Sequence, residues 1–275
     1  MKPVKFQYAR PANLSAAIEL GGRDDVMVKF IAGGQSLGPM LNLRLVQPDI
    51  LVDITAVPDL KRIEQRPESL FIGACVTHAD IEDGRVPDVC RGVMRTVAAG
   101  IAYRAVRNRG TIGGSLIHAD PSADWISALA VLGAQAVVRD REQERRLPVE
   151  KLMTGVFESS LSQGELLIGV EVPRLSPNAR WGYFKHWRKT GEFAHAIGAY
   201  VHDPDRALRR AVIGATGTRP IVLTDTTALF GGKPDGEIDR DFAKHAMADN
   251  GVTDPIEQQI HFACLRRAIA QARRA

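Results

Sequence analysis

The chain has 275 residues, of which 45% are hydrophobic and 25% charged, and its formal net charge is +4. This composition is typical of a globular protein, and it excludes a disordered chain, a coiled coil and a collagen-like fibre. The small net charge, with both signs interspersed, predicts no nucleic-acid partner. At roughly 150 residues per domain, the length allows one large domain or two modest ones.

The cysteines Cys75, Cys90 and Cys264 lie far apart in the sequence. Because no CxxC spacing occurs, we expect neither zinc nor an iron–sulfur cluster to be held by this chain. So few cysteines, in an odd number, favour a reducing compartment over a disulfide framework. The N-terminus has no apolar signal segment, and no apolar run approaches the ~20 residues that span a bilayer. We therefore expect a cytoplasmic protein without a membrane span.

The first third of the chain alternates helix and strand patterns. Asn13 predicts the cap of a short helix, and Gly21-Gly22 predicts its end. The β-rich runs at residues 26–31 and 50–54 then suggest a small βαβ unit. A strand is predicted at residues 70–74, followed by a short helix over 77–82.

Residues 111–138 form the most regular stretch. Thr111 to Ser115 predict a glycine-rich turn. Asp120 and the following Pro121 predict the start of a helix over residues 122–132. A strand at residues 136–138 then leads into the charged run 139–146, which we interpret as a solvated hairpin tip.

A change of pattern at residues 173–177, Pro-Arg-Leu-Ser-Pro, predicts a domain boundary. Beyond it, the sequence predicts an antiparallel sheet followed by helices. The expected strands cover residues 182–188, 194–201 and 211–215, and the expected helices cover about 239–248 and 256–273.

Two short motifs suggest other enzyme classes but lack the right context. Gly34 to Gly38 match GxSxG, the nucleophile elbow of α/β-hydrolases, but too few residues precede Ser36 to build the strands that come first. Gly231 to Pro234 superficially match a P-loop but have no Ser or Thr after the lysine. No GxGxxG occurs, so the sequence does not support a Rossmann nicotinamide site.

Two Gly-Gly motifs remain, AGGQSL at 32–37 and TIGGSL at 111–116. Glycine allows backbone N–H groups to approach an anion closely, and successive N–H groups form concave anion sites. A pair of such cradles would fit a diphosphate held from both sides. On spacing alone, two ordinary tight turns are the alternative.

The segments AGGQSL at 32–37 and NRGTIGGSLIHADPSADW at 108–125 resemble the FAD-binding medium subunits of molybdenum hydroxylases. This is the family of the carbon monoxide dehydrogenase medium chain and the xanthine dehydrogenase flavin domain. The resemblance extends over the whole chain, including IGACVTHADIE at 72–82 and LLIGVEVP at 166–173.

The resemblance implies an α+β fold in two domains. Residues 1–175 would form a vanillyl-alcohol-oxidase-type FAD-binding domain, with subdomains at about 1–57 and 58–175. Residues 176–275 would form a C-terminal domain of the carbon monoxide dehydrogenase flavoprotein type, with a three-stranded antiparallel sheet and helices.

The resemblance also implies a cofactor site, with no catalytic residue and no metal ligand in this chain. Gln35 stands where relatives frequently have histidine, so backbone contacts should persist while side-chain contacts change. The residues expected to hold the FAD diphosphate and its flanking sugars are Lys29, Ile31, Ala32, Gly33, Gly34, Gln35, Ser36, Leu37, Thr111, Gly113, Gly114 and Ser115.

Five further positions match family contacts with the rest of the cofactor. Asp124 would lie on the flavin side, Ile101 near the adenine, and Leu167 would contribute a backbone contact. Lys185 would be a basic group near the flavin ring, and Phe193 stands where some relatives have a tyrosine. A phenyl ring there can stack but offers no hydroxyl. The histidines at positions 78 and 118 also match the family, and we assign them no role.

By resemblance, the chain is the FAD-binding electron-transfer subunit of a multisubunit molybdenum hydroxylase. A large subunit with a molybdopterin cofactor would hydroxylate the substrate, and a small subunit with two [2Fe–2S] clusters would pass electrons to this flavin. The flavin would then reduce an external acceptor. The expected assembly is a dimer of heterotrimers. The alternatives are a standalone FAD-dependent oxidoreductase acting directly on a small molecule, and an interaction subunit without flavin.

Overall fold

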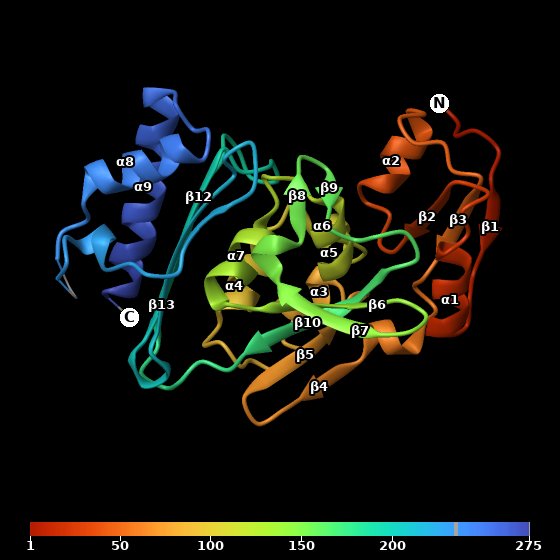
Figure 1. The fold of residues 1–275 in the computed structure, drawn as a ribbon, viewed down its shortest axis with the longest axis horizontal. Coiled ribbons are helices and arrows are strands. Elements are labelled where there is room, and N and C mark those ends of the chain that lie inside the picture. Colours follow the sequence, from red (N-terminus) through yellow and green to blue (C-terminus); the bar gives the residue numbers. More distant parts are fainter. Residues whose placement is uncertain (234–235, 275) are drawn as a thin grey trace.

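The computed structural model describes residues 1–233 and 236–274. Pro234, the last residue of the P-loop-like sequence, lies outside the described residues. Three parts follow one another across the molecule, and the two termini lie at opposite sides (Figure 1). No helix in the described ranges is long and apolar enough to cross a bilayer.

The N-terminal part is a three-stranded parallel sheet of order β1-β3-β2, drawn in red and orange in Figure 1. The side chain of Asn13 accepts a hydrogen bond from the N–H of Ala16, which confirms the predicted helix cap. Strand β2 ends opposite Asp53, and the chain then enters the first glycine motif directly. The elements are β1 (Gln7–Ala9), α1 (Leu14–Gly21), β2 (Val28–Ile31), α2 (Leu37–Asn42) and β3 (Ile50–Asp53).

The middle part is a five-stranded antiparallel sheet of order β4-β5-β10-β6-β7, with helices packed against it. Every residue of helix α7 is buried, and most of its residues are apolar. The elements are β4 (Ile63–Gln65), β5 (Ser69–Gly73), α3 (His78–Glu82), α4 (Val93–Ala99), α5 (Arg104–Arg107), α6 (Ile112–His118), α7 (Asp124–Leu132), β6 (Gln135–Arg139), β7 (Glu144–Pro148), the hairpin β8 (Met153–Gly155) and β9 (Glu158–Ser159), and β10 (Leu166–Pro173).

The C-terminal part is an antiparallel sheet of order β11-β12-β13-β14. A Cβ at Gly182 or Gly198 would collide with the backbone of α9, so these glycines allow the helix to lie directly on the sheet. Helix α7 packs against β12 and β13. The elements are β11 (Arg180–His186), β12 (Ala196–Asp203), β13 (Leu208–Gly214), β14 (Ile221–Leu223), α8 (Arg240–Asp249) and α9 (Pro255–Ala272).

Short 3₁₀ turns complete the described structure. They are η1 (Pro58–Lys61), η2 (Val149–Lys151), η3 (Pro204–Arg206) and η4 (Ala228–Phe230).

The prediction of three C-terminal strands was wrong by one strand. The three expected strands are present, and β14 pairs with β13 to make a fourth. Strand β14 has only three residues, directly after Pro220, which is too short for a recognisable period-2 pattern.

Two local predictions around the second glycine motif were also wrong. Residues 112–118 form helix α6, and Thr111 caps it, so the glycines lie in a first helical turn. A Cβ at Gly113 would lie 2.5 Å from that of Ala74, so close packing, not a turn, requires glycine there. Helix α7 begins at Asp124, because Asp120 instead closes a local turn by accepting from the N–H of Ser122.

Candidate functional site

A cavity of about 370 Å³ lies where the two glycine motifs meet, between the N-terminal and middle parts. Its wall includes every residue predicted to contact the cofactor except Asp124 and Lys185. Residues more than 150 positions apart, from Lys29 to Phe193, therefore come together around one space. The structure brings the predicted site together, with those two exceptions.

The first glycine motif presents a row of unpaired backbone donors to this cavity. Within residues 1–233 and 236–274, the N–H groups of Gly33, Gly34, Gln35, Ser36 and Leu37 donate to no protein acceptor. Gly34 has φ +71°, a conformation that favours glycine and turns the backbone into a concave loop. Successive N–H groups in such a loop form an anion site. This loop is therefore suited to a phosphate group.

The second glycine motif is built differently, although its sequence is similar. The N–H of Gly114 donates to Oγ1 of Thr111 at 3.0 Å, and the N–H of Gly113 donates to the Ala74 carbonyl at 2.9 Å. The N–H of Ser115 donates to the Thr111 carbonyl at 3.0 Å. These three backbone N–H groups are therefore already hydrogen-bonded within the protein. The second motif lines the cavity without offering them as free donors.

Glycine at position 33 allows the two motifs to approach each other. A Cβ there would lie 2.1 Å from the carbonyl oxygen of Arg109. On the other side, a Cβ at Gly114 would lie 3.8 Å from the Cβ of Ala32, in ordinary contact. The Arg109–Gly110 backbone that leads into the second motif therefore lies directly against the first motif.

Asp124 and Lys185 are buried and bind each other instead of lining the cavity. The Lys185 Nζ lies 2.8 Å from Oδ1 of Asp124 and 3.0 Å from Oδ2. The Tyr183 hydroxyl also donates to Asp124, at 2.7 Å. Burial raises the pKa of the Asp124 carboxyl, while the neighbouring Lys185 acts in the opposite direction.

Lys185 contacts the backbone beside Ile101, and Ile101 lines the cavity. The Lys185 Nζ donates to the carbonyl of Gly100 at 2.8 Å, next to Ile101. The ammonium group of Lys185 therefore reaches the backbone of this wall, while its side chain does not line the cavity.

Several cavity residues had no role assigned from sequence. His78 lines the cavity and is buried, and burial, with the nearby Arg107 cation, lowers its pKa to about 4. His118 and Asp120 also line the cavity. Both belong to the segment at 108–125 that resembles the family, and this resemblance could have indicated them.

Phe157 also lines the cavity, and its sequence context gave no signal. It lies at the tip of the β8–β9 hairpin with φ +58°, and its N–H donates to the Ala119 carbonyl at 2.9 Å. Its ring lies 5.0 Å from that of His118. The hairpin thus adds an aromatic surface that only the fold brings to the site.

The residues present fit a dinucleotide with a diphosphate. The free N–H groups of the first motif suit the phosphates, and the side chains of Ser36, Ser115 and Asp120 can bind sugar hydroxyls. Aromatic and aliphatic residues such as Phe157, Phe193 and Ile101 supply surfaces for planar rings.

Comparisons with known proteins agree with this site. Residues 4–175 match the family described as the FAD binding domain in molybdopterin dehydrogenase. The nicotine 6-hydroxylase medium subunit of Paenarthrobacter nicotinovorans is 35% identical over 223 residues, which are 79% of this chain and 77% of that one.

Two solved structures match over 100% of this chain and 99% of their own. One is a carbon monoxide dehydrogenase from Hydrogenophaga pseudoflava lacking the Mo-pyranopterin moiety of its molybdenum cofactor, with a TM-score of 0.87 and 26% identity. The other is quinoline 2-oxidoreductase from Pseudomonas putida 86, with a TM-score of 0.85 and 32% identity.

The chain therefore belongs to the family of FAD-binding domains of molybdopterin dehydrogenases. Within that family, it is an FAD-binding medium subunit of the molybdenum hydroxylase type, and so an oxidoreductase component. This confirms the family resemblance of the two glycine motifs and the expectation that FAD is its cofactor.

Proposed function

We propose that this chain holds FAD in the cavity between the glycine motifs and transfers electrons through it. Electrons would come from the [2Fe–2S] clusters of a small partner subunit, after a large molybdopterin subunit has oxidised the substrate. The flavin would pass them to an external acceptor. The observation that carries the proposal is the row of unpaired N–H groups at Gly33 to Leu37 in a cavity lined by the family's contact positions.

We also propose that the chain folds as two domains. Residues 1–175 would form the FAD-binding domain, with subdomains at about 1–57 and 58–175, and residues 176–275 the C-terminal domain. The family match over residues 4–175 supports this boundary.

We propose a cytoplasmic dimer of heterotrimers. Burial of all three free cysteines, which raises the pKa of Cys75 and Cys90 to about 12, suits a reducing compartment.

The first test concerns the cofactor. Acid precipitation of the purified chain should release intact FAD, because the cavity offers backbone and polar contacts without a matching attachment motif. Recovery of FMN, or of flavin that stays with the denatured chain, would contradict this proposal. A purified, folded chain that contains no flavin and takes none up would favour the flavin-free interaction subunit.

The second test separates a complex subunit from a standalone oxidoreductase. The isolated chain should be reduced by dithionite but should turn over no hydroxylase substrate. Adding reduced small and large subunits should restore flavin reduction, and these subunits should co-purify with molybdenum and iron. Substrate oxidation by this chain alone, with stoichiometric flavin reduction and no metal, would favour the standalone enzyme.

A further inference from the structure

Three consecutive carbonyls beside the cavity each accept a hydrogen bond from a cationic side chain. The Gly100 carbonyl accepts from Lys185 Nζ at 2.8 Å. The carbonyls of Ile101 and Ala102 accept from Arg107 Nη1 at 3.0 and 3.2 Å. Ile101 and Ala102 line the cavity, and Ala102 has φ +41°, which alanine rarely adopts. Such a conformation persists only where its surroundings hold it.

Each cation is itself fixed by a carboxylate. Lys185 pairs with Asp124, and their side chains are only 6% and 10% exposed. Arg107 binds Glu82 through two hydrogen bonds, Nε to Oε2 at 2.7 Å and Nη2 to Oε1 at 2.9 Å. Such charge-assisted, partly buried contacts are stronger and more directional than exposed ones. The wall is therefore held by two anchored cations.

The two cations come from different parts of the molecule. Arg107 on α5 and Glu82 on α3 both belong to the middle part, whereas Lys185 comes from β11 of the C-terminal part. Of the two cations, Lys185 is therefore the one that links the C-terminal sheet to the wall of the cavity.

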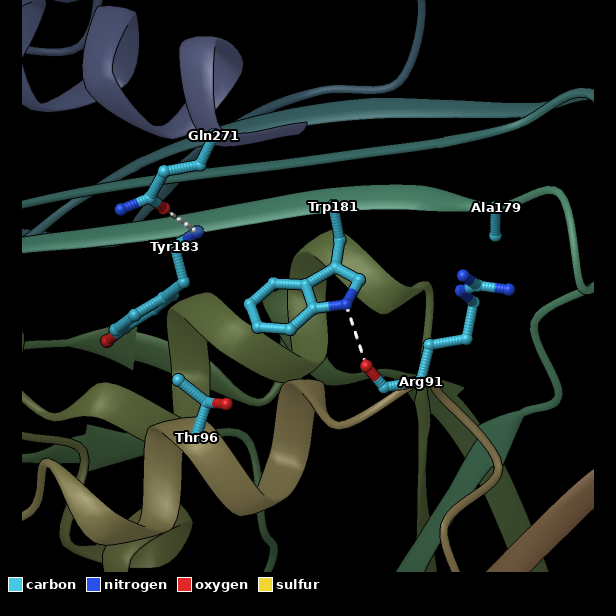
Figure 2. A pocket seen from close by; sticks show the side chains of 6 residues that line it. All are labelled: Arg91, Thr96, Ala179, Trp181, Tyr183 and Gln271. Atoms are coloured by element: carbon cyan, nitrogen blue, oxygen red, sulfur yellow. Dashed lines mark hydrogen bonds between the residues drawn. The ribbon is translucent and has the colours of Figure 1, made fainter. Parts of the chain in front are cut away.

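Lys185 shares one face of β11 with two side chains that make polar contacts with the middle part. Trp181, Tyr183 and Lys185 project from the same face of the strand, since strand side chains alternate. Trp181 Nε1 donates to the Arg91 carbonyl at 2.9 Å, and the Tyr183 hydroxyl donates to Asp124. Figure 2 shows the hollow between β11 and α4 that these side chains border, a cavity of about 620 Å³ also lined by Thr96.

We propose that Lys185 and Arg107 are positioning residues that hold the Gly100–Ala102 wall of the cofactor cavity. Through Lys185, strand β11 of the C-terminal domain would hold this wall without any need for its ammonium to touch the cofactor. The proposal rests on the proposed function in so far as the cavity is taken to hold FAD. Its structural half, the clamped wall, is testable without FAD.

The test uses four variants of the full chain. Lys185→Met is combined with Asp124→Asn, because removing the lysine alone would leave a buried unpaired charge and could prevent folding. Arg107→Met removes the other cation. Arg104→Met is the matched control, because Arg104 also binds Glu82 but donates to no carbonyl of the wall. Tyr183→Phe is the second control, because it removes a donor to Asp124 and keeps the Gly100 contact.

Two measurements are made on each variant. Hydrogen exchange of a peptide covering residues 99–105 is followed in the FAD-free chain, and the dissociation constant of FAD is measured by flavin fluorescence. We expect the exchange rate of this peptide and the dissociation constant of FAD each to rise about tenfold or more in the Arg107→Met and Asp124→Asn/Lys185→Met proteins. Both controls should stay within about twofold of wild type.

Each outcome decides a separate claim. If hydrogen exchange is unchanged in Arg107→Met and in Asp124→Asn/Lys185→Met, these cations do not hold the wall. Faster exchange with unchanged FAD affinity would show that holding the wall does not position the cofactor. Equal changes in the two control variants would also overturn the positioning role. If the wild-type chain binds no FAD while exchange still responds to the clamp variants, the proposed function fails and the positioning of a cofactor fails with it, but the clamped wall stands.

Discussion

The indole Nε1 of Trp125 donates a hydrogen bond to Nδ1 of His78, 3.0 Å away. His78 must therefore be neutral, with its proton on Nε2, because a protonated Nδ1 cannot accept. A Cβ at Gly110 would lie 2.8 Å from that Nε2, so the loop before the second glycine motif packs directly on the imidazole. Trp125 is fully buried, and the pair joins α3 to α7 behind the cavity.

The first prediction concerns pH. Burial, and secondarily Arg107, lowers the pKa of His78 in the folded state to about 4, whereas the unfolded value is about 6.5. The neutral His78 ring contributes fully to the free energy of unfolding above pH 6.5. This contribution is lost as pH falls toward 4, because the unfolded chain binds a proton at a higher pH than the folded chain does. The free energy of unfolding should fall by up to about 1.4 kcal/mol per pH unit within this window.

Urea unfolding between pH 7.5 and 4 measures this slope. His261 is also buried with its pKa lowered to about 4, and burial lowers the pKa of His118 too, so the slope of wild type should be the sum of three such terms. His78→Gln should reduce the slope and leave the terms of His261 and His118. The same slope in His78→Gln and wild type would show that His78 is not the titrating group.

Much of the fold follows from local patterns in the sequence. Asn13 and Thr77 mark helix starts that their side chains do cap, because capping needs only neighbouring residues. Helix α7 ends at Leu132, as predicted, and Gly133 follows it in a left-handed conformation. The hydrophobic runs of β3, β5 and β12 likewise needed no distant information.

The parts that could not be predicted depend on distant partners. Thr111 to Ser115 appeared to be a turn, but Thr111 caps a helix here, and Gly113 in its first turn packs closely against the distant Ala74. The carbonyl clamp depends on Lys185 and Gly100, which are 85 positions apart and share no pattern. Phe157 reaches the cavity because a hairpin folds over α6, and residue type alone does not encode that.

The second prediction compares two glycines of the first motif. Gly33→Ala would place a methyl group 2.1 Å from the Arg109 carbonyl, so the two motifs would have to move apart. We expect a loss of about 1–3 kcal/mol in the free energy of unfolding and a sharp fall in bound flavin.

Gly38→Ala is the matched control for this change. A Cβ at Gly38 meets nothing within 4 Å, and alanine is the better helix former in α2. Thermal melting and flavin content of both proteins test the comparison. Equal behaviour of the two variants would show that the close approach at Gly33 is not required.

The third prediction ranks two hydroxyl side chains. Thr111→Ala removes the acceptor of the Gly114 N–H and the cap of α6, which should cost about 0.5–2 kcal/mol of stability. Thr111→Ser should recover most of it. Ser36→Ala should retain more flavin than Thr111→Ala, because the Ser36 side chain makes no cap bond within the described chain and is at most one cofactor contact. A folded Ser36→Ala protein without any flavin would reverse this ranking.

The last prediction concerns Phe193, which lines the cavity while remaining 62% exposed. Because an exposed ring contributes little to folding, Phe193→Ala should change the free energy of unfolding of the FAD-free chain by less than about 0.5 kcal/mol. If the ring stacks on the bound cofactor, FAD affinity should fall about three- to tenfold and flavin fluorescence should rise. Phe193→Tyr should keep the affinity, because it preserves the ring and adds a hydroxyl. Ile256→Ala, at a 70% exposed position on α9, is the control for a surface truncation remote from the cavity. Equal FAD affinity and fluorescence in Phe193→Ala, Ile256→Ala and wild type would remove Phe193 from the site.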